Sequence, residues 1–421
     1  MKISLNKILL YILYVYVFLT PFERILEFLY GIDTYFKPYR IAGILLLLLG
    51  FFYNIRRKGF FAFPPDRLLY IMFGYGITYT IVLYLMGKHV NLGGFANSTT
   101  QIVFFLLIHV TIKRINLTYR HMYKILNVLA AGVLINTAIV VSDFYLFQLA
   151  SRVQGMTDNS NYAAVQMCMV ALYFIFLILK NKFRLFDLHN LFYLAAAGFL
   201  FFGILATGSR TGLGIIVLCT AFLLVVMTDW STKVRLVPFG LAVIAFVLVN
   251  SKLVDLASEA STFNRLQGVE TDVRIPLWTA GKNAIIDTWG MGVGMAQIVY
   301  NKANFKKYMM PVDPNIANMV DSRGKALGLH SMYMEIMVEM GLIAMAIYLL
   351  YLFYLLRYQY RMYRLSGRRQ EHTLLIILLS TVLLMGFTGK GIMSALFWFM
   401  YTIAGIYFIE DEPTSPEKAA A

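Results

Sequence analysis

Arginines in short polar connections between apolar segments are the first residues in this sequence that suggest chemistry. Arg210 lies in the sequence TGSRTG at 207–212, between two strongly apolar stretches. A guanidinium group near a membrane usually faces a cavity or a charged partner, because its burial in hydrocarbon costs free energy. Such an arginine would bind an anion, for example a phosphate group. The alternative is an arginine that ends a helix and extends its side chain to the interface.

A second polar connection, at 152–161, opens with Arg152. Asp158, Asn159 and Ser160 are residue types that cap the N-terminus of a helix, and we expect that role for them. Arg152 has no capping role, which leaves anion binding open. Several convergent guanidinium groups would suit a pyrophosphate, because bidentate arginine contacts match phosphate geometry.

His330 is the residue best suited to move a proton. It ends the run GKALGLH at 324–330 and comes directly before an apolar segment. A neutral imidazole, with an unperturbed pKa of about 6.5, can take a proton from a hydroxyl group. The alternative is a structural histidine that bonds the start of a helix. The other histidines lie in or near connections or segment ends without comparable neighbours and are given no role: His89, His109, His121, His189 and His372.

Three candidate supporting residues follow His330. Glu335 and Glu339 are four residues apart and would share one face of a helix, with Tyr333 close by. The two carboxylates could be catalytic, or they could pair with an outward arginine. The sequence has no HExxH pattern and no outward cluster with the spacing of metal ligands. It therefore favours neutralisation of an anion by arginine, without a metal or other cofactor.

The composition indicates which elements hold these residues. Of 421 residues, 59% are hydrophobic and 14% are charged, whereas a soluble domain is nearer half apolar and a quarter charged. At about 20 residues per span, the chain has room for roughly a dozen membrane helices. We expect an all-α polytopic membrane protein with spans near 8–20, 39–54, 68–87, 98–112, 122–147, 161–179, 190–206, 212–228, 234–250, 331–356, 373–388 and 392–409.

The distribution of positive charge predicts the orientation. Most Lys and Arg residues in short connections fall on one side of this map, which places both termini in the cytoplasm. The net charge of +15 therefore reports topology first and does not point to nucleic acid. A minority of basic residues lies in short outward connections, where topology alone disfavours them: Arg24, Lys37, Arg40, Lys88, Arg152, Arg210 and Lys390.

A long outward segment is expected at 251–329. Within it, 273–288 mixes apolar and charged residues, which predicts an amphipathic helix along the membrane interface. The glycine run WGMGVG at 289–294 follows, and we interpret it as a backbone turn. The chain thus divides into a membrane part at 1–250, the outward segment at 251–329, a second membrane part at 330–409 and a tail at 410–421.

Together these segments resemble the family of O-antigen ligases and related polymerases of bacterial surface polysaccharide synthesis. The similarity covers about residues 150–345 and depends on the order and spacing of short pieces. These are TGSRTG at 207–212, Arg274 through Trp278 to Gly292 and Gly294, His330-Ser331 with Tyr333, Glu335, Glu339 and Gly341, and Arg152 with Gly155, Asn159 and Asn161.

The resemblance implies a glycosyltransferase with a GT-C-type membrane fold in the bacterial inner membrane, with a periplasmic active site. Its donor would be a glycan on undecaprenyl diphosphate, and its acceptor a sugar hydroxyl of lipid A-core. Arg210 and Arg274 would hold the diphosphate, with Arg152 and Arg265 as further anion ligands. His330 would be the catalytic base, and the reaction would need no metal.

Two alternatives stay open. A surface-polysaccharide polymerase of the same family would use the same chemistry with another glycan as acceptor, and the sequence separates it poorly from a ligase. A membrane transporter of an anionic solute would also place basic groups on the outward side. Transporters often carry internal repeats, and neither a repeat nor midplane ionisable residues suited to alternating access are evident in the sequence.

Overall fold

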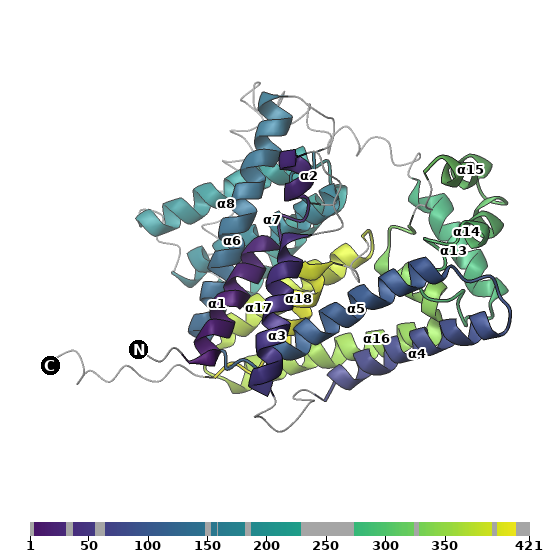
Figure 1. Cartoon of the computed structure of the whole chain (residues 1–421). Helices are drawn as coiled ribbons and strands as arrows, with labels where there is room; N and C mark the ends of the chain where they lie inside the picture. Colours follow the sequence, from purple (N-terminus) through teal and green to yellow (C-terminus); the bar gives the residue numbers. More distant parts are fainter. Residues whose placement is uncertain are drawn as a thin grey trace.

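The computed structural model describes residues 4–30, 37–54, 64–147, 153–157, 159–181, 187–228, 273–323, 328–389 and 394–409. Over these residues the regular structure is helical, apart from an isolated β-bridge between Thr118 and Ile409. The helices, labelled as in Figure 1, are α1 (Leu5–Leu19), α2 (Ile25–Tyr30), α3 (Pro38–Asn54), α4 (Asp66–Leu85), α5 (Leu92–Lys113), α6 (Tyr119–Val141), η1 (Ser142–Leu146), α7 (Ser160–Lys180), α8 (Leu188–Ala206), α9 (Arg210–Met227), α13 (Arg274–Asp287), α14 (Lys302–Met309), α15 (Pro314–Arg323), α16 (Met332–Leu365), α17 (Arg369–Gly386) and α18 (Ala395–Ala404).

Helices occupy the predicted membrane spans wherever the structure describes them. Within the described ranges, seven are long and apolar enough to cross a membrane: α4, α5, α6 with η1, α7, α8, α9 and α16. The helices α1, α3 and α18 are apolar but shorter. These elements confirm a polytopic helical membrane protein. The span predicted at 234–250 lies outside the described residues, so the total of about twelve spans stays a prediction.

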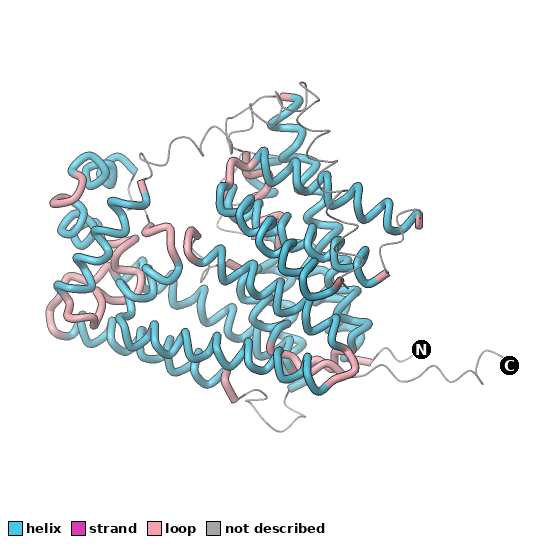
Figure 2. Tube along the Cα trace, turned by 180° about the vertical axis from the view of Figure 1, so that it is seen from behind, coloured by secondary structure: helices cyan, strands magenta, loops and turns pink. Residues whose placement is uncertain are grey.

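The helices form two groups in Figures 1 and 2. The long helices α4, α5 and α16 run in similar directions, and α13, α14 and α15 gather at one end of them. In the other half, α7 packs against α6, α8, α9 and α17. In the most apolar stretch of α7, 83% of the residues are buried. A helix that is apolar on all sides is buried on all sides, which explains the central place of α7.

A buried polar cluster ties α4, α5 and α18 together. The carboxylate of Asp66 accepts hydrogen bonds from Lys113 Nζ at 2.7 and 2.9 Å, and His109 Nε2 lies 3.1 Å from Asp66 Oδ1. His109 Nδ1 lies 2.8 Å from the Thr402 hydroxyl. His109 therefore has polar neighbours that its sequence position did not suggest. Because breaking a buried ion pair leaves an uncompensated charge, this cluster fixes the three helices relative to one another.

A second polar cluster joins α6, α7, α16 and α17. Lys180 Nζ donates to Glu371 Oε1 at 2.8 Å. His372 Nε2 lies 2.9 Å from the Tyr119 hydroxyl, and His372 Nδ1 lies 2.8 Å from Gln359 Oε1. His372 thus also has polar contacts, which the sequence analysis did not expect. Both clusters lie at the ends of their helices, where they hold the bundle together.

The helix predicted at 273–288 is α13. It buries Leu277, Ala280 and Ala284, and it joins α14 through Asp287. That carboxylate accepts from Lys307 Nζ at 2.6 Å and from the Tyr308 hydroxyl at 2.8 Å. These two bonds, the lysine one most, lower the pKa of Asp287. Placement of α13 along the membrane interface stays a prediction.

Candidate active site

The helix that carries His330 and the candidate carboxylates is interrupted at Gly341. There the backbone has φ 87° and ψ 173°, which is not helical. The span predicted at 331–356 is present as α16, and its helix is interrupted at this glycine. A short first part of α16, residues 332–340, is separated from a long second part, and both parts have backbone groups that cannot bond within the helix.

The glycine run fills this interruption. Val293 N donates to Val338 O at 2.8 Å, and Gly294 N donates to Glu339 O at 2.9 Å. In the other direction, Leu342 N donates to Gly290 O at 2.8 Å. A helix can be broken within a membrane protein where neighbouring groups satisfy the freed backbone, and this run supplies those groups.

The conformation of the run depends on its glycines. Positive φ angles occur at Trp289, Gly290, Gly292, Gly294 and Ala296, a region that L side chains rarely adopt. A Cβ at Gly292 would lie 2.8 Å from both Glu339 O and Gly341 N. The interpretation of 289–294 as a backbone turn is confirmed, and the turn docks on α16.

Residues of α4 hold the run from another side. Met295 N donates to Thr80 Oγ1 at 2.8 Å, and the Tyr79 hydroxyl donates to Gly292 O at 3.0 Å. Neither Tyr79 nor Thr80 was singled out from the sequence. No local sequence pattern around these two residues points to a contact with the glycine run.

Two of the three candidate supporting residues, Glu339 and Tyr333, make positioning contacts. The Glu339 carboxylate accepts hydrogen bonds from Ala296 N at 2.9 Å and from Ile298 N at 3.4 Å, so it fixes the end of the glycine run. The Tyr333 hydroxyl donates to Leu383 O at 2.8 Å, which joins α16 to α17. Glu335 is buried on the same short helical part.

Arg274 begins α13, and His330 lies just before α16. A hydrogen bond joins these two segments. Arg274 is the first residue of α13, and one turn later Trp278 Nε1 donates to Leu329 O at 3.0 Å. Leu329 directly precedes His330. The indole bond therefore sets the first turn of α13 beside the residue proposed as the base.

His330 has an unusual backbone conformation. Its φ is +53°, and it comes directly before Ser331, the N-cap of α16. The Ser331 hydroxyl accepts from Met334 N at 3.3 Å. Positive φ is uncommon for residues other than glycine, and such conformations concentrate at functional sites. The side chain of His330 is half-buried at the mouth of the helix.

Arg210 is the first residue of α9, in a tight turn after α8. Ser209 caps the helix by accepting from Gly212 N at 3.1 Å, and the Thr207 hydroxyl donates to Ile204 O at 2.7 Å. Gly208 has a φ of 65°, which lets the chain reverse within a few residues. The guanidinium group is thus half-buried at the end of two packed helices.

Helix α17 lies between the helices that carry Arg210 and His330. On one side, the Thr381 hydroxyl lies 3.8 Å from Cys219 Sγ of α9. On the other, Leu383 accepts the bond from Tyr333 of α16. Cys219 is nine residues after Arg210, or about 13 Å along the helix. The N-terminal ends of α9 and α16 therefore flank the C-terminal end of α17.

Two predicted anion ligands, Arg152 and Arg265, lie outside the described residues. Asn159, in the same connection as Arg152, caps α7 as expected, since its side chain accepts from Asn161 N at 2.8 Å. Over the described part of the chain, no three His, Cys, Asp or Glu side chains are grouped so that they could hold a metal ion. The sequence expectation of a metal-independent site stays a prediction.

Residues 194–349 match the family model described as O-antigen ligase. Over these residues the chain is similar to the O-antigen ligase family. The matched residues, which we call the O-antigen ligase segment, contain Arg210, α13, the glycine run and His330. Helices α4 and α17, which contact them, lie outside the match. Arg152 lies before its first residue. No curated protein matches the chain.

Proposed function

We propose that this protein is an O-antigen ligase. It transfers a glycan from undecaprenyl diphosphate to a sugar hydroxyl of lipid A-core, at the periplasmic face of the bacterial inner membrane. The observation that supports the proposal is the bond from Trp278 to Leu329 within the O-antigen ligase segment, because it joins α13, which begins at Arg274, to the residue before His330. A cation and a base at one helix mouth suit an anionic leaving group and a hydroxyl nucleophile.

The mechanism we infer is direct displacement. His330 takes the proton of the acceptor hydroxyl as that oxygen forms a bond to the anomeric carbon of the donor glycan. The bond from this carbon to the diphosphate oxygen breaks, and undecaprenyl diphosphate leaves with the electron pair. Arg210 and Arg274 stabilise the negative charge on the leaving group, with Arg152 and Arg265 as further ligands. One displacement inverts the anomeric configuration.

Arg210→Ala and Arg274→Ala should each lower kcat/KM for the donor by about 10- to 100-fold. A hydrogen bond to a charged group contributes about 1.5–3 kcal/mol, and a guanidinium group bonded to phosphate belongs to this class. The measurement is transfer of glycan from purified undecaprenyl diphosphate donor to lipid A-core, with thermal unfolding recorded for each variant.

Lys282→Ala is the matched control, since Lys282 is an exposed cation on the same helix as Arg274. It should leave transfer unchanged. If the two arginine variants lost folded protein in proportion to activity, the arginines would be helix-end residues with no part in donor binding.

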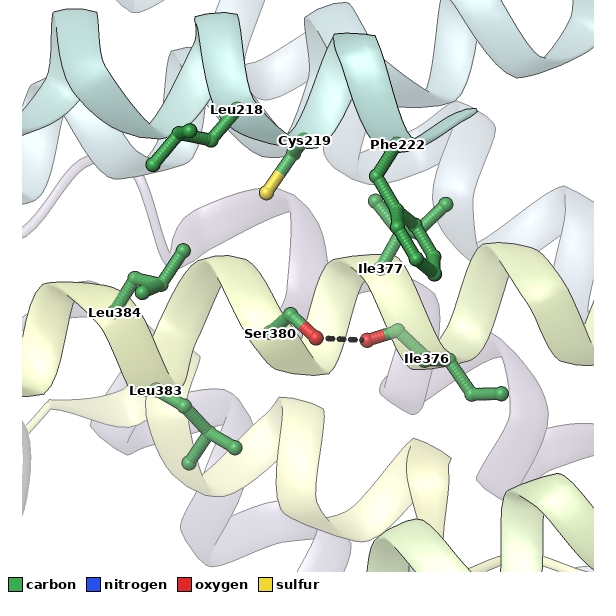
Figure 3. A pocket seen from close by; sticks show the side chains of 8 residues that line it. All are labelled: Leu218, Cys219, Phe222, Ile376, Ile377, Ser380, Leu383 and Leu384. Carbon is green, nitrogen blue, oxygen red and sulfur yellow. Dashed lines mark hydrogen bonds between the residues drawn. The ribbon is translucent and has the colours of Figure 1, made fainter. Parts of the chain in front are cut away.

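A groove between α9 and α17 is suited to the isoprenoid tail of the donor. It has a volume of about 350 Å³, and Figure 3 shows the largely apolar side chains that line it. The one hydroxyl there, on Ser380, already donates to Ile376 O at 2.8 Å. The lining residues are Leu218, Cys219, Phe222, Ile376, Ile377, Ser380, Leu383 and Leu384. The groove lies on the helix that begins at Arg210, which is the proposed diphosphate ligand.

Leu218→Trp should therefore lower kcat/KM about tenfold for the undecaprenyl donor and leave a short-chain prenyl donor unaffected. Tenfold corresponds to losing contact with about two methylene groups at about 0.8 kcal/mol each. Val217→Trp is the control, because Val217 is exposed on α9 and does not line the groove. Equal effects on long and short donors would contradict the placement of the tail.

A further inference from the structure

Helix α16 extends beyond the apolar segment that the sequence assigned to it. The predicted span ends at 356, whereas the helix continues to Leu365. The extension includes Arg357, Arg361 and Arg364, which we call the arginine stripe. The three residues are spaced i, i+4 and i+7, so they lie on one face of the helix. All three are exposed.

The arginine stripe continues an exposed apolar side of α16. Leu350 and Phe353 precede Arg357 at intervals of seven and four residues, and they are exposed by 42% and 55%. The same face therefore changes from exposed apolar side chains to guanidinium groups within about one turn, or about 5 Å. This change marks the depth at which the hydrocarbon ends and the headgroups begin.

No ion pair within the described residues neutralises the arginine stripe. The nearest acidic residue in sequence is Glu371, which is bound by Lys180 at 2.8 Å and approached by Arg368 at 3.9 Å. The segment 357–370 contains no Asp or Glu. Within the part of the chain that the structure describes, no acidic side chain takes up the positive charge of the stripe, so a phosphate group can bind it.

Aromatic and apolar groups flank the arginine stripe. Tyr360 is exposed by 57% and stacks on Tyr363 with ring centroids 6.3 Å apart. Leu365, at the end of the helix, is exposed by 70%. Tyrosine rings beside basic residues are typical of helices at the membrane interface, where the rings lie among headgroups. A soluble acidic partner would not require this apolar border.

We propose that the arginine stripe binds the phosphate groups of anionic phospholipids in the adjacent leaflet. Each guanidinium group can hold a phosphate by two hydrogen bonds, and the spacing of the stripe covers about 10 Å of helix. This end of α16 also contacts the C-terminal segment, since the Tyr358 hydroxyl donates to Ile406 O at 3.3 Å. Under the predicted topology, the leaflet is the cytoplasmic one, opposite the proposed active site.

The test uses the full chain in detergent, titrated with phosphatidylglycerol or with phosphatidylcholine, with the thermal unfolding midpoint as readout. The wild type should be stabilised by phosphatidylglycerol and much less by phosphatidylcholine. The triple variant R357Q/R361Q/R364Q should bind phosphatidylglycerol more weakly than the wild type, by on the order of a hundredfold. Each basic residue near an anionic surface strengthens binding about fivefold, and the three contributions multiply. Added salt should reduce the wild-type response.

The control K88Q/K282Q/K302Q removes three exposed charges elsewhere in the described chain and should keep the response to phosphatidylglycerol. If the glutamine variant does not fold, R357K/R361K/R364K serves in its place. The lysine variant keeps the charge but loses the bidentate contacts, so it should bind phosphatidylglycerol several-fold more weakly than the wild type. An unchanged response in the variants of the stripe, or an equal loss in the control, would overturn the proposal.

Discussion

Replacement of His330 by alanine is expected to lower glycan transfer by two to four orders of magnitude while the protein stays folded. General base catalysis contributes about 10²- to 10⁴-fold, and alanine cannot accept the proton of the acceptor hydroxyl. The loss should appear in kcat, because donor binding depends on the arginines. Single-turnover transfer from undecaprenyl diphosphate donor to lipid A-core gives this value directly.

A second variant separates catalysis from backbone strain. His330→Asn keeps a residue type that tolerates positive φ, as the backbone at +53° requires, yet it removes the base. It should be as inactive as His330→Ala. His189→Ala, at an exposed position on α8, should be fully active. Full activity of His330→Asn would show that the position matters only for its backbone.

Gly341→Ala should destabilise the protein by about 3–5 kcal/mol. A Cβ at this position would lie 2.5 Å from Met291 O and 2.7 Å from Gly290 O. Glycine alone readily adopts the backbone angles found there. Holding another residue in this conformation costs about 1–3 kcal/mol. Displacement of the glycine run would also break hydrogen bonds worth about 1 kcal/mol each. Thermal unfolding of the purified variant measures the effect.

Gly74→Ala provides the contrast. Gly74 lies inside α4, and a Cβ there would meet nothing within 4 Å. Alanine is preferred over glycine within a helix by about 0.5–1 kcal/mol, so this variant should be neutral or slightly more stable. If Gly341→Ala behaved in the same way, the docking of the glycine run on α16 would not be important for stability.

The sequence predicted most of the helices because each apolar run must become a helix to satisfy its backbone in lipid. The positions of Arg210 and His330 at helix starts follow from the same reasoning, since polar residues interrupt the apolar runs there. Helix α13 was also predicted, from apolar and charged residues alternating over 273–288. Each of these predictions depends on a pattern that lies within a single segment of the sequence.

Contacts between distant segments could not be predicted in this way. The break at Gly341 depends on a glycine run some fifty residues earlier in the chain, and nothing in the apolar span around it suggests an interruption. His109 was given no role because its partner Asp66 lies on another helix. The length of α16 was underestimated because arginines ended the apolar pattern without ending the helix.

The most direct test of the account is transfer by the purified protein, reconstituted in vesicles with undecaprenyl diphosphate-linked glycan and offered two acceptors. One is lipid A-core, and the other is a second molecule of the glycan donor. We predict glycan-bearing lipid A-core with inverted anomeric configuration and no lengthening of the donor glycan. Lengthened donor glycan with unmodified lipid A-core would identify a polymerase, and no transfer to either acceptor would contradict the proposed glycosyltransferase activity.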